Sequence, residues 1–217
     1  MLTVGTSAWW TREVTCVNML AMPYHHGNLR EALIVAATQL AAEHGPDAVV
    51  LREAARRVGV SHNAAYRHFA DRDALLRAVS ARAMAQFGQL VADRIAAAAD
   101  GEDGQAAAAR FEASGRAYVE FAMTQPGLFR LVCARSLGDV ELEDGAHHPY
   151  TQLSERLDEL VATGVITPAR RTDAEVGAWS AVHGFSMLVL DGPLRDASPD
   201  ERAAGLTEVL RMVREGI

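Results

Sequence analysis

Apolar positions recur every three or four residues along most of the chain, and no stretch shows the two-residue alternation of a strand. The first helical run is predicted to begin at Asn28, which forms a capping-box pattern with Glu31, and to end at Gly45-Pro46. Similar runs with their own start and stop signals follow to the end of the chain. The pattern therefore predicts an all-α protein of about nine or ten helices.

Two short helices joined at a glycine are predicted in residues 50–69, VLREAARRVGVSHNAAYRHF. The first, Leu51 to Val58, has its apolar residues on one face, and Gly59 can supply the left-handed residue that ends it. Ser61 stands at the N-cap position of the second helix. This is the pattern of a helix-turn-helix, whose tight turn braces the second helix so that its first residues can enter a DNA major groove.

The outward face predicted for the second helix suits a DNA duplex. Its side chains are those of His62, Asn63, Tyr66 and Arg67. Contacts to phosphates fix the register of a protein on DNA, whereas contacts to base edges select the sequence. Phosphate contacts at the rims are expected from Arg52, Tyr66, His68 and Arg72. A helical hairpin with a charged outer face is the alternative, but GVSHNAAYRHFADRDALL is more specific than such a hairpin.

Residues from Tyr24 to about Val79 closely resemble the tetracycline-repressor (TetR) family of bacterial transcription regulators. The matching segments are YHHGNLREALIVAATQLAAEHG, LREAARRVGVS and AYRHFADRDALLRAV. The resemblance implies that Tyr66 and His68 contact phosphates, that Arg72 grips the backbone, and that residues 62–65 face the bases. The candidate DNA-binding residues are therefore Arg52, Ser61, His62, Asn63, Ala64, Tyr66, Arg67, His68 and Arg72.

One position departs from the family pattern. Relatives usually place Ser or Thr where this chain has Val50, so that a hydroxyl caps the first helix of the motif and touches a phosphate. A valine side chain can do neither. We therefore expect that cap and that phosphate contact to be missing here.

The pattern divides the chain into three parts. Residues 1–21 are expected to form a poorly ordered arm, residues 22–80 the TetR-type helix-turn-helix domain, and residues 81–217 a C-terminal effector-binding and dimerisation domain. A long helix capped by Asp71 and unbroken through Ile95 is predicted to join the last two. The division therefore separates a DNA-reading part from a ligand-sensing part.

The N-terminal arm lacks a basic start, a long apolar run and a small-residue cleavage site, so neither a signal peptide nor a membrane span is predicted. Translation from Met19 or Met22 would explain an arm without structure. An arm that reaches into a minor groove is the alternative. No other stretch reaches 18 apolar residues, so no membrane contact is predicted, and we expect a cytoplasmic protein.

The formal net charge of −7 is unevenly distributed. Residues 22–80 contain seven arginines against six acidic residues, and five histidines besides, whereas residues 81–217 contain 13 arginines against 21 acidic residues. An acidic C-terminal part would be repelled by a duplex that the N-terminal part binds, which helps to orient the approach.

Three helices with clear start signals are predicted near the C-terminus. The first runs from Tyr150 to Thr163, and capping boxes at Thr172–Glu175 and Ser198–Glu201 open the other two. The middle helix, VGAWSAVHGFSMLVLDG, is apolar nearly all round and is therefore expected to be buried on more than one side. One side would face a ligand cavity and the other a partner subunit.

Trp179, His183 and Met187 fall on one stripe of this middle helix. From Gly115 to about Pro193 the chain resembles, more loosely, a TetR subgroup whose C-terminal domain carries a WHG motif. The candidate ligand-binding residues are Tyr118, Phe121, Phe129, Trp179, His183 and Met187. This lining suits a small, largely apolar effector. The same residues could instead only fill a core, with His183 bonded to a buried carbonyl.

These expectations combine into a homodimer that binds a palindromic double-stranded DNA operator through two recognition helices. A small-molecule effector in the C-terminal domain would tilt the helix from Asp71 to Ile95 and release the operator. Repression is the family default. The alternatives are an activator with the same fold, or a helical scaffold or ligand-binding protein that does not bind DNA.

The sequence contains no recognised catalytic or metal-binding motif. GxSxG, P-loop, HExxH and CxxC motifs are missing, so no enzyme and no cofactor are predicted. His25 and His26, and the acidic segment 136–149, lack metal-ligand spacing, so no metal site is expected. Cys16 and Cys133 are far apart and suit a reducing compartment without disulfides.

Overall fold

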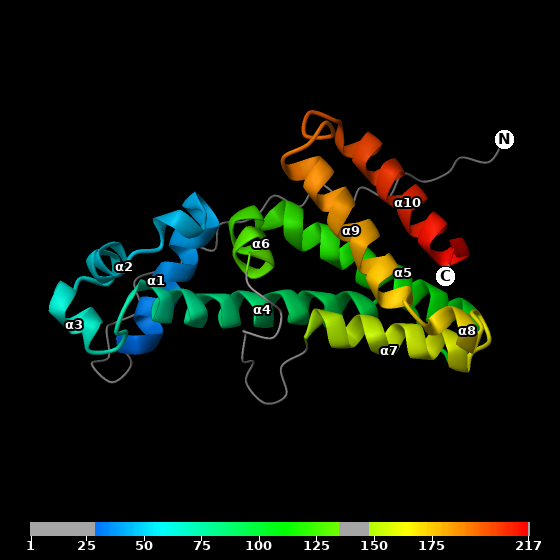
Figure 1. The fold of residues 1–217 in the computed structure, drawn as a ribbon, viewed down its shortest axis with the longest axis horizontal. Coiled ribbons are helices and arrows are strands. Elements are labelled where there is room, and N and C mark those ends of the chain that lie inside the picture. Colours follow the sequence, from blue (N-terminus) through cyan, green and yellow to red (C-terminus); the bar gives the residue numbers. More distant parts are fainter. Residues whose placement is uncertain (1–28, 135–147, 217) are drawn as a thin grey trace.

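The computed structural model describes residues 29–134 and 148–216 (Figure 1). Every regular element in these two ranges is a helix, which confirms the predicted all-α fold. The helices are α1 Leu29–His44, α2 Leu51–Val58, α3 His62–Tyr66, α4 Arg72–Ala96, α5 Gly104–Thr124, α6 Pro126–Cys133, α7 Pro149–Ala162, α8 Pro168–Arg171, α9 Ala174–Leu190 and α10 Pro199–Gly216, with a short 3-10 helix η1 Pro46–Ala48.

Helices α1, α2 and α3 gather around the first turns of α4 at one end of the molecule (Figure 1). Their shared core is built from buried apolar side chains that recur at helical spacing, including Leu33, Leu40, Leu51, Ala65, Phe69 and Leu75. The long helix α4 then continues without a break into the rest of the protein, as predicted. Asp71 caps it, because the Asp71 side chain accepts a hydrogen bond from the backbone N–H of Ala74 at 2.7 Å.

Helices α5 to α10, called the body below, lie beside the far part of α4, and α5, α6 and α7 pack directly on it (Figure 1). Helix α5 lies between α4 and α9, and α10 runs beside α9 at the outer edge. Two smaller apolar clusters hold these layers together, one around Phe111 and Leu157 and the other around Phe185 and Leu210. The helix α6 packs against α1, α4 and α5, so it lies at the junction of the body and the N-terminal helices.

Of the two capping boxes predicted near the C-terminus, only one forms. The capping box at Ser198 is confirmed, because Ser198 N–H donates to Glu201 and Glu201 N–H donates to the Ser198 hydroxyl. The prediction of a capping box at Thr172 is wrong. Thr172 ends the short helix α8, and Asp173, with φ 65°, precedes α9 without a side-chain cap. Glu175 instead accepts hydrogen bonds from Tyr150 and Arg171.

Several predictions concern residues outside the described ranges. These are the arm of residues 1–21, the capping residue Asn28, the pair His25 and His26, Cys16, and the acidic segment up to residue 147. Within the described ranges no helix is both long and apolar enough to cross a membrane. The same ranges contain no group of three or more His, Cys, Asp or Glu side chains that could hold a metal ion.

Candidate DNA-binding face and ligand cavity

The turn between α2 and α3 is held by backbone and side-chain hydrogen bonds. Gly59 adopts the left-handed conformation, with φ 77°, and its N–H donates to the Arg56 carbonyl. The Ser61 hydroxyl accepts a hydrogen bond from Ala64 N–H at 3.2 Å and so caps α3. Ala65 is fully buried on the inner side of α3. The sequence therefore fixes α3 against α2 at both the turn and the packed face.

Among the described residues, none covers the outer side of α3. His62, Asn63, Arg67 and His68 are exposed, and Tyr66 is 46% exposed. The rings of His62 and Tyr66 meet edge to face, with centroids 4.6 Å apart. Ala64 is half-buried, and Ser61 is exposed while it caps the helix. The structure thus brings these seven candidate residues together around one short, outward-facing helix.

The arginines around this face differ in their partners. Arg56 donates to Glu53 at 2.6 and 2.8 Å, and Arg57 donates to Glu43 at 2.7 Å. The hydrogen bond from Arg57 holds the pKa of Glu43 below its ordinary value. Within the described ranges, Arg52 and Arg67 have no acidic partner. Their charges are therefore available for phosphates, which carry the electrostatic part of DNA binding.

Arg72 makes contacts that the sequence analysis did not predict. Its Nε donates to the Val49 carbonyl at 2.7 Å and its second guanidinium nitrogen donates to the Pro46 carbonyl at 2.9 Å. The side chain thereby ties the first residue of α4 to the segment just before α2. Val50, as expected, provides no side-chain cap for α2.

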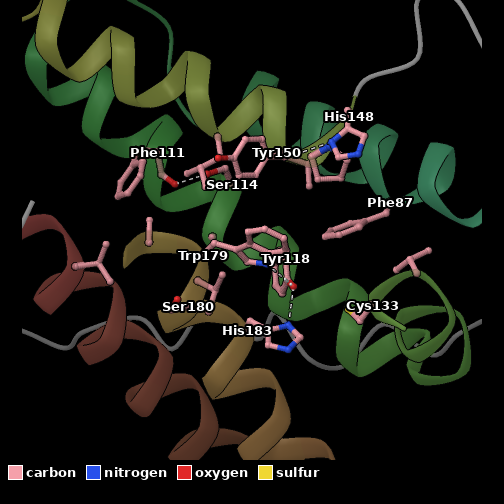
Figure 2. Close-up of a pocket in the computed structure, with 18 of the residues that line it drawn as sticks. Phe87, Phe111, Ser114, Tyr118, Cys133, His148, Tyr150, Trp179, Ser180 and His183 are labelled. Carbon is pink, nitrogen blue, oxygen red and sulfur yellow. Dashed lines mark hydrogen bonds between the residues drawn. The ribbon is translucent and has the colours of Figure 1, made fainter. Parts of the chain in front are cut away.

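A cavity of about 540 Å³ lies between α4 and the helices of the body. Its walls come from α4, α5, α6, α7, α9 and α10, and the labelled side chains converge on it in Figure 2. The larger lining side chains include Phe87, Phe111, Tyr118, Tyr150, Trp179 and His183. None of the described residues that line it is Asp, Glu, Lys or Arg. The cavity is therefore apolar, with a few polar atoms at fixed places.

The Tyr118 hydroxyl is the centre of a small hydrogen-bond network in the cavity wall. Trp179 Nε1 donates to it at 3.0 Å, and the hydroxyl lies 3.0 Å from His183 Nδ1 (Figure 2). Burial raises the pKa of Tyr118 well above its usual range. Trp179 and His183 stand one turn apart on α9, so together they fix the position of the Tyr118 ring.

The opposite wall is formed at the start of α7. His148 caps this helix, because its Nδ1 accepts a hydrogen bond from Tyr150 N–H at 3.2 Å (Figure 2). Burial lowers the pKa of His148. The Tyr150 hydroxyl donates to Glu175 at 2.6 Å, and its ring meets Trp179 edge to face. Cys133 also lines the cavity, and burial raises the pKa of its thiol to about 11.

The structure brings three of the six candidate ligand-binding residues to the cavity, namely Tyr118, Trp179 and His183. Phe121 and Phe129 lie in the main core, where Phe121 stacks on Phe87 with centroids 4.5 Å apart. Met187 is 37% exposed and does not line the cavity. The ring of His183 bonds a phenol rather than a carbonyl. The wall from α7, with His148 and Tyr150, was missed because helix-to-helix packing leaves no mark on local spacing.

Comparison with known protein families gives two matches. Residues 33–79 match the description "Bacterial regulatory proteins, tetR family", and residues 111–213 match "Tetracyclin repressor-like, C-terminal domain". The first match contains the whole α2-turn-α3 motif, and the second contains most of the cavity. Membership of the WHG subgroup stays a prediction.

Similar curated proteins share only the N-terminal part. An HTH-type transcriptional repressor of Mycobacterium tuberculosis (strain H37Rv) is 41% identical over 58 residues, which are 27% of this chain and 31% of that protein. An HTH-type transcriptional regulator of Mycobacterium bovis gives the same values. The match thus spans about a third of the length of these relatives.

Similar solved structures cover nearly the whole chain. A protein of unknown function from Rhodococcus sp. RHA1 is 29% identical, with a TM-score of 0.72, over 90% of this chain and 98% of that one. A putative tetR family transcription regulator from Shewanella sp. PV-4 is 20% identical, with a TM-score of 0.58, over 84% of this chain and 96% of that one, and shares the fold. Taken with the two family matches and the geometry of α2 and α3, these likenesses show that the chain belongs to the tetR family of bacterial transcription regulators.

Proposed function

We propose that this regulator binds a palindromic DNA operator as a homodimer, and that a small, largely apolar effector in the body cavity releases it. The observation that carries the proposal is the exposed polar side of α3, held outward by the Gly59 turn and the Ser61 cap. Repression is the expected outcome of operator binding, and activation by the same contacts is the alternative. Its place of action is the cytoplasm, where the chromosome lies.

DNA contacts divide by position on α3. His62 and Asn63 stand at the start of the helix, where side chains of a recognition helix meet base edges. Tyr66, His68, Arg52 and Arg67 lie around the rim, where phosphates are contacted. Arg72 supports this face through the carbonyls of the preceding loop, and any phosphate contact it makes comes in addition to that role.

A second copy of the chain has a suitable surface on α9. Val176 is 62% exposed and Leu188 is 44% exposed, and no charged residue stands between Glu175 and Asp191 on this helix. Nothing lies within 4 Å of a Cβ placed at Gly184, so a neighbouring helix could approach closely there. Because α10 adds Met212 at 59% exposure, α9 and α10 of two copies could pack as a bundle.

Two helices connect the cavity with the DNA-binding end. Helix α4 carries Met84, Phe87 and Val91 of the cavity wall and begins beside α3. Helix α6 carries Val132 and Cys133 of the wall and packs on α1. An effector that displaces either helix would change the separation of the two recognition helices. A coupling of about 1–3 kcal/mol would change operator affinity roughly five- to 150-fold.

The proposal is tested by selecting bound sequences from a library of random DNA duplexes and measuring affinity for the selected duplex by fluorescence anisotropy. Replacing Tyr66 and His68 together by Ala should weaken binding to every duplex by about tenfold or more, since contacts to charged phosphates contribute roughly 1.5–3 kcal/mol. The matched control is Arg195→Ala, an exposed charge on the body, which should bind as the wild type does.

Selection of an inverted repeat, together with loss of binding in the α3 variant alone, would support a DNA-binding regulator. A helical scaffold or simple ligand-binding protein would enrich no sequence and would not respond to the Tyr66 and His68 changes. Equal loss of affinity in the Arg195→Ala control would show that binding does not depend on α3 in particular, and would contradict the role given to α3.

A further inference from the structure

We propose that the effector is an uncharged, mainly apolar molecule with hydrogen-bond acceptor oxygens, such as a ketone, ester or lactone, which accept from Nε2–H of His183 and His148. This inference rests on the proposed function, in which the cavity is the effector site. It goes further by naming the chemistry that the cavity selects. Figure 2 shows the two imidazoles on different walls, His183 on α9 and His148 at the start of α7.

The described lining favours uncharged effectors over charged ones. None of the described lining residues is acidic, lysine or arginine, so a bound carboxylate or ammonium group would find no permanently charged counter-ion among them. Transfer of an unpaired ion from water into such a site costs several kcal/mol. Glu175, which accepts a hydrogen bond from the lining residue Tyr150, also accepts one from Arg171. Its carboxylate is therefore already paired inside the protein.

The hydrogen bonds of Tyr118 favour a neutral His183 ring with its proton on Nε2. Trp179 Nε1 can only donate, so the Tyr118 oxygen accepts from it and the Tyr118 proton needs another acceptor. His183 Nδ1 lies 3.0 Å away, and an imidazole nitrogen is a better acceptor than a thiol sulfur such as that of Cys133. The neutral His183 ring therefore carries its proton on Nε2. That nitrogen has no partner among the described residues.

The neutral His148 ring also carries its proton on Nε2, for a different reason. Its Nδ1 accepts from Tyr150 N–H at 3.2 Å, which requires an unprotonated Nδ1. The proton of the neutral ring is then on Nε2, and burial favours this neutral form. Across the described part of the chain, Nε2 of His148 meets no acceptor. Both rings thus keep an N–H donor that has no acceptor among the described residues.

The other strong donors of the cavity are already used inside the protein. The Tyr150 hydroxyl donates to Glu175, the Ser114 hydroxyl donates to the Phe111 carbonyl, and Trp179 donates to Tyr118. The Cys133 thiol is only a weak donor, and Ser180 is exposed. The two imidazole N–H groups therefore dominate what the cavity offers to a ligand, and they favour acceptor oxygens.

Size and shape agree with such a ligand. A volume of about 540 Å³ falls in the range of roughly 300–1,000 Å³ for small-molecule sites. The walls between the two histidines consist of the rings of Phe87, Tyr118 and Trp179 and of aliphatic side chains. Most of the ligand surface would therefore be apolar, with oxygens at one or two points.

The test uses the full-length wild-type protein without DNA and four probes of equal carbon number: 2-decanone, γ-decalactone, decanoate and decylamine. Isothermal titration calorimetry should give dissociation constants for the ketone and lactone at least about tenfold below those of the anion and the amine, the difference expected from about 1.4 kcal/mol. Tighter binding of decanoate or decylamine than of both neutral probes would overturn the proposal.

Two variants test whether the imidazoles cause the preference for the ketone and the lactone. His183→Phe keeps the ring volume without the donor, and His148→Ser keeps a cap for α7 but is too short to reach a ligand. Each should weaken ketone binding by about tenfold while the thermal midpoint shows that the protein is folded. His44→Ser, at an exposed histidine of α1 that does not line the cavity, is the control and should bind the ketone as the wild type does. Unchanged ketone affinity in both histidine variants would also overturn the proposal.

Failure of this inference can be distinguished from failure of the proposed function. Release of the selected duplex by decanoate or decylamine alone would contradict the effector class and leave the regulator intact. Selective ketone binding that has no effect on duplex affinity would support the chemistry of the cavity and contradict the proposed switch.

Discussion

Gly127 of α6 packs so closely on the Ala41 carbonyl of α1 that a Cβ atom at position 127 would stand 1.9 Å from that oxygen. Helix α1 belongs to the DNA-binding end, whereas α6 ends in the cavity wall at Val132 and Cys133. This backbone contact therefore joins the two functional parts directly, in addition to the continuous helix α4.

Gly127→Ala should push α6 away from α1. Overpacking of this kind costs about 1–3 kcal/mol, and each kcal/mol lowers the melting temperature of a protein this size by roughly 2–4 °C. Differential scanning calorimetry measures the shift. Gly177→Ala on α9 is the control, because nothing lies within 4 Å of its added Cβ, and it should not lower the melting temperature. Equal melting temperatures for Gly127→Ala and the wild type would mean that the contact is loose.

Val50→Ser should stabilise the DNA-binding end. Val50 occupies the N-cap of α2 in extended backbone without a side-chain cap, and it is 40% exposed. A serine hydroxyl there can accept from the first turn of α2, which contributes about 0.5–2 kcal/mol. Urea unfolding measures the change. Ser61→Ala removes the existing cap of α3 and should lower stability by a similar amount. A Val50→Ser variant less stable than the wild type would contradict this account of the motif.

Leu188→Glu should separate the proposed dimer. The side chain is 44% exposed on the uncharged face of α9, so a glutamate costs little in a monomer but would be buried without a partner between two copies. Light scattering after size-exclusion chromatography should give a dimer mass for the wild type and a monomer mass for the variant. Val165→Glu, at a position 37% exposed outside α9, should stay dimeric. A dimer mass for Leu188→Glu would place the interface elsewhere.

Glu175 should make stability depend on acid pH. Hydrogen bonds from Ser154, Tyr150 and Arg171 lower its pKa to about 2, from an ordinary value of 4.5. The folded state therefore binds its proton more weakly than the unfolded state does, so the stabilisation is full above pH 4.5 and is lost as pH falls toward about 2. In urea unfolding, the stability difference between wild type and Glu175→Gln should shrink over that interval. A difference independent of pH would rule out this role.

Local signals in the sequence were enough to predict the DNA-binding motif. Gly59, Ser61 and Asp71 each act within four residues of their partners, so their roles follow from spacing alone. Arg72 was different, because the Val49 carbonyl that it contacts lies 23 positions earlier in the chain. Its part in holding the loop before α2 could not be predicted from spacing.

The cavity was predicted less completely for the same reason. Tyr118 and His183 are 65 positions apart, and their hydrogen bond depends on how α5 and α9 cross. Phe121 and Phe129 are the kind of residues that line ligand sites, but both are buried in the main core. The false capping box at Thr172 shows a similar competition, since Glu175 forms stronger contacts with Tyr150 and Arg171.

The most direct test of the central claim is to repeat the random-duplex selection with Asn63→Ala, at the exposed start of α3. If α3 reads base edges, the wild type selects an inverted repeat with half-sites about 34–36 Å apart, and the variant relaxes preference at the same position of each half-site by about 1–3 kcal/mol. An unchanged preferred sequence in the variant, or no preferred sequence for the wild type, would contradict the claim.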